Sequence, residues 1–247
     1  GFTSSQAMSE IGVAMGMSMP ILSIPSTLIG SIALVMVPEL AENFFRGEHE
    51  KLRDNIERAI KVTVLIVCLL IPPLFVLGVD IGELLFSSTQ GGEIIRDCCF
   101  MLLPMSLGMM TNSILNSLGY EKLTCAYFFI GAAVTLSCVW FLPQLVGIYA
   151  LMIGMAGSSV VTMVLNLRLI AKKSKEKVRY LKHTFIAAAS MVPAIAFGCL
   201  LRDLFGKLMP ALPAAILCGC ILLAAEGLFI LALGLARPQW VKVLVRK

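Results

Sequence analysis

The sequence predicts an all-α integral membrane protein with seven transmembrane helices, and three observations support this prediction. Of its 247 residues, 58% are hydrophobic and only 14% are charged, and the mean hydropathy is +0.91. A soluble protein covers its surface with polar groups, and this chain has too few of them. The apolar residues form long runs, and basic residues gather in alternate connections between these runs. Lipid is therefore the expected solvent for most of the surface.

Seven apolar runs are each close to the length of about 20 residues that a helix needs to cross the hydrocarbon core. The predicted spans are residues 12–38, 60–79, 97–118, 123–142, 145–170, 183–203 and 211–235. Helices are expected because lipid offers no hydrogen-bond partner for an unpaired backbone amide. A membrane β-barrel would instead have alternating segments of about ten residues, and these runs are longer and do not alternate.

Basic residues predict the orientation of the spans, because Lys and Arg favour the cytoplasmic side. Most of the 20 Lys and Arg residues lie in or beside segments 41–61, 119–122 and 172–182 or near the C-terminus, whereas Arg96, Arg202 and Lys207 lie in the other connections. We therefore expect a multi-pass protein of the cell membrane with residue 1 outside and the C-terminus in the cytoplasm. The net charge of +5 indicates this topology and attraction to anionic lipids, not nucleic-acid binding.

The charged segment between the first two spans predicts an interfacial amphipathic helix at about 41–60. Leu52, Ile56 and Ile60 are four residues apart and share one face, while most charged residues occupy the other faces. This helix is either a plain connection or a moving gate or coupling element.

Several spans contain polar residues that a simple membrane anchor does not need. The candidate substrate-cavity residues are Ser23, Thr27, Ser31, Asn112 and Asn116. They recur every four residues on one face of the first and third spans, where prolines interrupt the helices, as is typical of transporters. The two asparagines either meet another helix or line a cavity. The fifth span carries a ladder with the same spacing, for which helix packing and contact with substrate are both open: Ala150, Gly154, Ser158, Thr162 and Asn166.

Ionisable and metal-binding side chains are scarce within the spans. Glu226 lies mid-span and is a candidate coupling carboxylate for protons or cations, or else a protonated or helix-paired carboxyl. Most of the eight cysteines lie in apolar runs, and His49 and His183 are far from them in the sequence. We therefore expect no metal site and no cofactor. The absence of catalytic motifs predicts that the protein is not an enzyme.

Five segments form an ordered set of motifs along the chain: PILSIPSTLIGSIALVMVPELAE (20–42), LRDNIERAIKVTVLI (52–66), LLFSS (84–88), SILNSLGYEK (113–122) and GIYALMIGMAGSSVV (147–161). This set resembles the stage V sporulation protein B family of polysaccharide-biosynthesis membrane proteins, within the multidrug/oligosaccharidyl-lipid/polysaccharide exporter superfamily. The resemblance implies helices 8–14 of a fourteen-helix fold with two lobes. Residues 1–171 would then form a partial C-terminal transport lobe, and residues 172–247 a basic cytoplasmic loop, two additional spans and a cytoplasmic tail.

The resemblance implies a flippase that moves a lipid-linked oligosaccharide or a peptidoglycan precursor across the membrane by alternating access, for cell-wall, polysaccharide or spore-cortex synthesis and hence sporulation. Its partners would be this substrate, the bilayer and an N-terminal lobe missing from this chain. Because the chain opens with GFTSSQAMSEIG, without an initiator Met, we expect it to be an internal part of a longer protein. The alternatives are a multidrug or cation antiporter of the same superfamily, or a non-transporting scaffold for envelope assembly.

Overall fold

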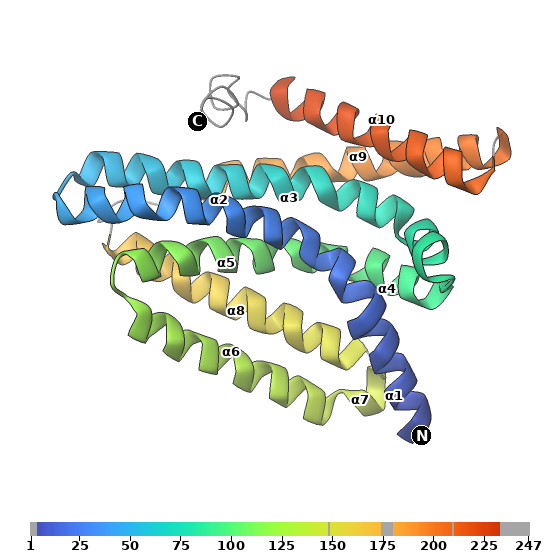
Figure 1. The fold of residues 1–247 in the computed structure, drawn as a ribbon, viewed down its shortest axis with the longest axis horizontal. Coiled ribbons are helices and arrows are strands. Elements are labelled where there is room, and N and C mark those ends of the chain that lie inside the picture. Colours follow the sequence, from blue (N-terminus) through green and yellow to red (C-terminus); the bar gives the residue numbers. More distant parts are fainter. Residues whose placement is uncertain (1–3, 148, 174–179, 209, 233–247) are drawn as a thin grey trace. The chain divides into compact units, whose positions relative to one another are not determined.

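The computed structural model describes residues 4–147, 149–173, 180–208 and 210–232, and all regular structure in these ranges is helical, which confirms the all-α prediction (Figure 1). The elements are α1 (Ser4–Val13), the π-helix η1 (Ala14–Ser18), α2 (Met19–Phe45), α3 (His49–Phe86), α4 (Thr89–Cys98), the 3-10 helix η2 (Cys99–Met101), α5 (Leu102–Ser117), α6 (Glu121–Phe141), α7 (Pro143–Val146), α8 (Tyr149–Lys173), α9 (Tyr180–Leu208) and α10 (Ala211–Ala232).

Seven helical segments within the described residues are long and apolar enough to cross a membrane, which confirms the predicted number of spans. They cover Met8–Phe45, His49–Phe86, Thr89–Ser117, Glu121–Phe141, Tyr149–Lys173, Ala188–Lys207 and Leu212–Leu231. Residue 1, residues 174–179 of the basic segment and the chain after residue 232 lie outside the described residues, and the inside–outside orientation stays a prediction.

The first span is interrupted where the sequence places its prolines. Pro20 has no backbone N–H, so the carbonyl of Gly16 cannot receive the usual bond from four residues later. The chain forms the π-helix η1 at this point, and Figure 1 shows the helix axis change direction between α1 and α2. Pro25 and Pro38 lie further inside α2 and remove two more bonds.

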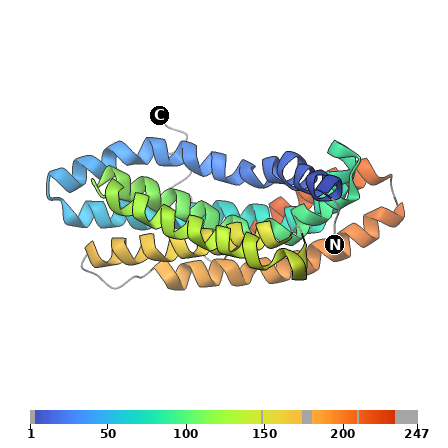
Figure 2. The same ribbon diagram turned by 90° about the horizontal axis from the view of Figure 1, so that it is seen from below.

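The charged segment after the first span does not form a separate helix, which differs from the predicted boundaries at about 41–60. Residues 41–45 complete α2, a tight turn follows at Gly47 (φ +72°), and residues 49–60 are the first turns of α3 (Figures 1 and 2). Asn55 of α3 donates a hydrogen bond of 2.9 Å to the Glu39 carboxylate of α2, which holds the two helix ends together.

The physical reason for this difference is that α3 is longer than the bilayer is thick. Its 38 residues extend about 57 Å at 1.5 Å per residue, against a hydrocarbon core of about 30 Å. Its polar first turns can therefore continue the helix beyond the lipid. Leu52, Ile56 and Ile60 share one face, as predicted, and are only 8%, 4% and 1% exposed. That face packs inside the protein, and a position at the membrane interface stays a prediction.

The described residues divide into two compact units, and the division falls within α3. The first unit comprises the described parts of Gly1–Thr63 and Cys98–Val178, and in it α5 packs against α2 and α8, while α8 also packs against α6. Small residues allow the close approach of α6 to α8: a Cβ at Gly131 would lie 2.6 Å from Ser158 Oγ and 2.8 Å from Thr162 Oγ1. The ladder on α8 therefore takes part in helix packing.

The second unit comprises the described parts of Val64–Asp97 and Arg179–Lys247, which include the second half of α3, α4, α9 and α10. Its apolar core centres on Val76, Leu77, Cys218 and Leu222. Helix α4 folds back on the end of α3 after Ser87, a residue with φ +51°. At the start of α4, the Ser88 hydroxyl accepts a hydrogen bond of 3.1 Å from the Gly91 amide. This contact stabilises the first turn of α4, which lies eight residues before the predicted start of the third span.

Candidate functional site

A groove of about 480 Å³ with both polar and apolar lining residues opens on the surface of the first unit. It is lined by Pro104, Met105, Gly108, Met109, Asn112 and Asn116 of α5, by Glu121, Thr124, Cys125 and Phe128 of α6, and by Ser158, Ser159 and Thr162 of α8. The groove therefore contains both of the predicted asparagines. It also contains polar residues of two further helices, including Thr124 and Ser159, which sequence reasoning did not single out.

The two asparagines differ in their hydrogen bonding. The side-chain oxygen of Asn116 accepts a hydrogen bond of 2.7 Å from the Thr124 hydroxyl, which fixes this carboxamide against α6. Asn112 lies one helical turn before Asn116 on α5 and is half-buried. Its carboxamide has no hydrogen-bond partner among the described residues. A carboxamide within a membrane span is costly unless it meets a polar group, so Asn112 is available to bind a polar ligand or water.

The α8 wall of the groove supplies hydroxyl groups. Ser158 and Thr162 border the groove and also pack against Gly131 of α6. Ser159 donates a hydrogen bond of 2.8 Å to the Met155 carbonyl of its own helix. Both interpretations of the α8 ladder, helix packing and exposure to a ligand, therefore have a structural basis.

The ladder ends at Asn166, which is fully buried between α5 and α8. Its side-chain amide donates a hydrogen bond of 3.3 Å to the Thr111 hydroxyl, which itself donates to the Leu107 carbonyl at 2.7 Å. Within the described part of the chain, the Asn166 side-chain oxygen has no hydrogen-bond partner. Asn166 does not line the groove. Its hydrogen bond to Thr111 holds α8 against α5.

The predicted polar stripe on α2 does not line the groove but lies next to it. The hydroxyls of Ser23, Thr27 and Ser31 donate to carbonyls of their own helix, at 2.8, 3.1 and 3.1 Å. Gly30 is adjacent to Thr27 and Ser31 on the helix surface, and a Cβ there would lie 2.7 Å from the methyl carbon of Met109. Since Met109 lines the groove, the surface of α2 that carries the stripe adjoins the groove. Their common role as a cavity stays a prediction.

Comparison with known families identifies the protein class. A family model described as "PelG: Putative exopolysaccharide Exporter (EPS-E)" matches residues 17–204, about three quarters of the chain. The chain belongs to the PelG family. No curated protein and no solved structure gives a match. The expectation of a multi-pass membrane protein of a polysaccharide-export family is therefore confirmed. The family shown is the PelG family, not the stage V sporulation protein B family.

The predicted coupling carboxylate of this PelG-family protein has a partner that the sequence did not reveal. Glu226 of α10 is only 2% exposed, and its carboxylate accepts a hydrogen bond of 3.0 Å from the Ser190 hydroxyl of α9. This pair joins two neighbouring helices of the second unit. Glu226 is not among the residues that line the groove, and its coupling role stays a prediction.

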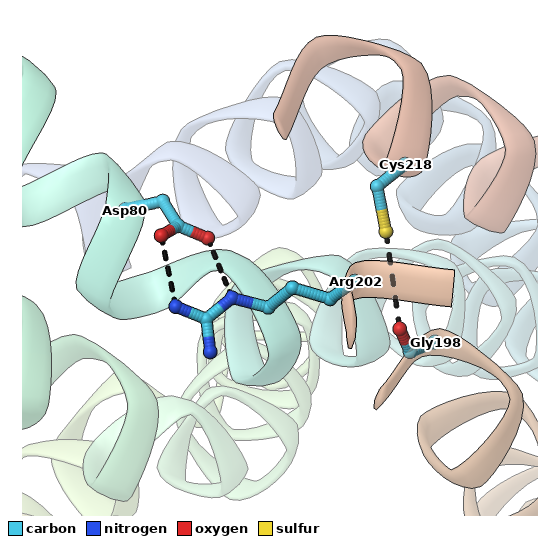
Figure 3. A network of polar contacts seen from close by, with 4 residues as sticks. All are labelled: Asp80, Gly198, Arg202 and Cys218. Atoms are coloured by element: carbon cyan, nitrogen blue, oxygen red, sulfur yellow. Dashed lines mark hydrogen bonds and ion pairs between the residues drawn. The ribbon is translucent and has the colours of Figure 1, made fainter. Parts of the chain in front are cut away.

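The second unit of the PelG-family chain also contains an ion pair that joins distant parts of the sequence. Arg202 of α9 donates two hydrogen bonds, of 2.8 and 2.9 Å, to the two carboxylate oxygens of Asp80 on α3 (Figure 3). Beside it, the Cys218 thiol of α10 lies 3.9 Å from the Gly198 carbonyl of α9. These contacts connect three helices and are structural. Among the described residues, no group of three or more His, Cys, Asp and Glu side chains is placed to hold a metal ion.

Proposed function

We propose that this PelG-family protein moves a saccharide across the cell membrane by alternating access, with the groove of α5, α6 and α8 as part of the path. The observation that carries the proposal is the half-buried Asn112 carboxamide, which faces the groove without a hydrogen-bond partner among the described residues. Sugar hydroxyls both donate and accept hydrogen bonds, so they can satisfy a carboxamide and the hydroxyls of Ser158 and Thr162. Family membership supports polysaccharide as the class of cargo.

The narrower form of this proposal is a flippase for a lipid-linked oligosaccharide, with a cell-wall or spore-cortex precursor as one such cargo. In this form the bilayer holds the lipid part while the groove and the α2 stripe contact the saccharide. The helix that would move is α2, which contains Pro25 and Pro38 and so lacks some of its backbone hydrogen bonds. Pro104 lies in the first turn of α5, where a proline is tolerated. The predicted N-terminal lobe would supply the opposite wall of the cavity.

Two other functions remain as alternatives to saccharide transport, and neither is enzymatic: a cation or drug antiporter, and a scaffold for envelope assembly. A cation or drug antiporter needs a coupling carboxylate, and the buried Glu226–Ser190 pair is the observation that favours this alternative. It predicts that Glu226→Gln abolishes dye efflux driven by an ion gradient. A scaffold for envelope assembly predicts normal polysaccharide secretion by a protein whose groove is altered.

The proposal is tested by replacing Asn112 with leucine, which keeps the side-chain volume but removes the carboxamide. We expect Asn112→Leu to lower polysaccharide secretion roughly tenfold, because a lost hydrogen bond to a substrate costs about 1–2 kcal/mol. The measurement is the amount of polysaccharide outside cells that depend on this protein, divided by the level of protein in the membrane.

The control variant for this experiment is Ser113→Leu on the same helix. Ser113 does not line the groove, and its hydroxyl donates only to the Met109 carbonyl of α5. Secretion by this variant is expected to match that of the unaltered protein. Equal secretion by Asn112→Leu and Ser113→Leu, at equal membrane levels, would contradict a role for the groove in transport.

A further inference from the structure

The end of the first unit where the α5–α6 turn meets the C-terminus of α8 is strongly cationic (Figure 1). We call it the cationic end, and it consists of Tyr120, Lys122, Arg168, Lys172 and Lys173. All four cations are exposed, and three of them are the only charged side chains of α8. Helix α5 carries no charged residue. This end therefore has a local excess of positive charge among the described residues of α5, α8 and the turn, which include one carboxylate, that of Glu121.

The turn between α2 and α3 is a useful contrast, because its cations are matched by carboxylates. Arg46 pairs with Glu42 at 2.8 Å, and Lys51 pairs with Glu48 at 2.8 Å. The hydrogen bond and the charge of Lys51 hold the pKa of Glu48 below its ordinary value. At the cationic end, none of the four cations forms an ion pair with a carboxylate among the described residues. Its charge is therefore available to an external anion.

Tyr120 positions one of these cations. The Lys173 ammonium lies 5.0 Å from the centroid of the Tyr120 ring, which is a cation–π contact between the end of α8 and the α5–α6 turn. An ammonium group has three N–H donors, and contact with one ring face leaves donors for an anion. Arg168 and Lys172 are four residues apart on α8 and so share the face beside Lys173. The result is a group of donors at the end of a membrane span.

We propose that the cationic end binds the phosphate group of an anionic phospholipid. The ends of membrane spans lie at the depth of lipid head groups, where each Lys or Arg is attracted by anionic lipids. The adjoining surface of α6 fits an acyl chain, because Phe129, which does not line the groove, is 67% exposed. A bound lipid would hold α6 and α8 together at this end. This inference does not depend on the transported cargo.

The test uses the purified protein in an uncharged detergent, titrated with phosphatidylglycerol or with phosphatidylcholine that carries the same acyl chains. Bound lipid is counted by native mass spectrometry. We expect phosphatidylglycerol to bind at least tenfold more tightly than phosphatidylcholine, because the choline cation offsets the charge of the phosphate group in phosphatidylcholine. The double variant Arg168→Gln/Lys173→Gln is expected to lose about 25-fold in affinity for phosphatidylglycerol, at roughly fivefold for each cation removed.

Two controls separate this site from general charge and from folding defects. Lys51→Gln removes a cation that is already paired at the other turn, so binding should not change. Tyr120→Phe keeps the aromatic face and should bind as the unaltered protein does, whereas Tyr120→Leu should lose affinity several-fold. Equal binding of both lipids would overturn the proposal, as would unchanged binding by the double variant. Full competition by inorganic phosphate at the same concentration would overturn the assignment to a lipid.

Discussion

Replacing Gly92 with alanine is expected to lower the free energy of unfolding by about 3 kcal/mol, at the upper end of the usual cost of overpacking. A Cβ at this position would lie 2.6 Å from the Val79 Cα and 2.8 Å from the carbonyl oxygens of Gly78 and Val79. These are backbone atoms, so no side chain can rotate to make room. Gly82 lies opposite, and a Cβ there would likewise collide with the backbone of Gly92 and Ser88. The added methyl group must therefore separate α4 from α3.

The measurement is thermal unfolding in detergent, followed by the loss of the helical circular dichroism signal. A change of about 3 kcal/mol corresponds to a decrease in Tm of roughly 6–12 °C for a chain of this size. The control is Gly227→Ala in α10, where a Cβ has no atom of the described structure within 4 Å. This substitution should leave Tm unchanged or raise it, since alanine favours a helix by about 1 kcal/mol. Equal Tm values for the Gly92→Ala and Gly227→Ala variants would contradict the close approach of α3 and α4.

The number of spans could be predicted because length and apolarity are local properties of each segment. The boundaries could not, because two helices continue beyond their apolar parts. Helix α3 begins at His49, inside the charged segment, where the i, i+4 ion pair of Glu57 and Lys61 stabilises the helix. Helix α4 begins at Thr89, in a stretch rich in polar residues and glycines, eight residues before the predicted start of the third span at residue 97. Apolarity predicts where a helix crosses lipid, not where it starts or ends.

The sequence contains a glycine pattern that indicates the close α3–α4 contact. Gly78 and Gly82 are four residues apart, so they present one face without side chains, which is the pattern of closely packed membrane helices. Gly92 meets that face from α4. The pattern could have predicted that a close helix contact exists. The pattern does not predict which helix packs against this face, because the position of α4 depends on the turn at Ser87 and Ser88.

The groove was predictable only in the part that lies on a single helix. The spacing of Asn112 and Asn116 placed both on one face of α5, and the structure locates both in the groove. The contributions of Thr124 and Ser158 depend on which helices pack beside α5. A single sequence does not show which helices are neighbours in the fold. The same limit applies to Glu226, whose partner Ser190 belongs to another span.

Reversing the charge of Arg202 is expected to be the second most damaging single change, because Asp80 and Arg202 hold α3 against α9 across 122 residues of sequence. The pair is bidentate, and the side chains of Arg202 and Asp80 are only 43% and 18% exposed, so water screens it incompletely. Arg202→Asp removes both hydrogen bonds and places two carboxylates side by side. We expect a loss of about 2–3 kcal/mol in the free energy of unfolding, or roughly 4–12 °C in Tm.

The double variant Asp80→Arg/Arg202→Asp separates the ion pair from other effects of the substitutions. It restores opposite charges at the same two positions, so we expect it to recover more than half of the stability lost by Arg202→Asp. The matched control is Arg46→Glu, which reverses an i, i+4 pair of the same 2.8 Å distance whose side chains are 66% and 55% exposed. Because water screens that pair, its reversal should cost less than about 1 kcal/mol. Equal losses for Arg202→Asp and Arg46→Glu, or no recovery in the double variant, would mean that the Asp80–Arg202 pair stabilises the second unit no more than an exposed pair does.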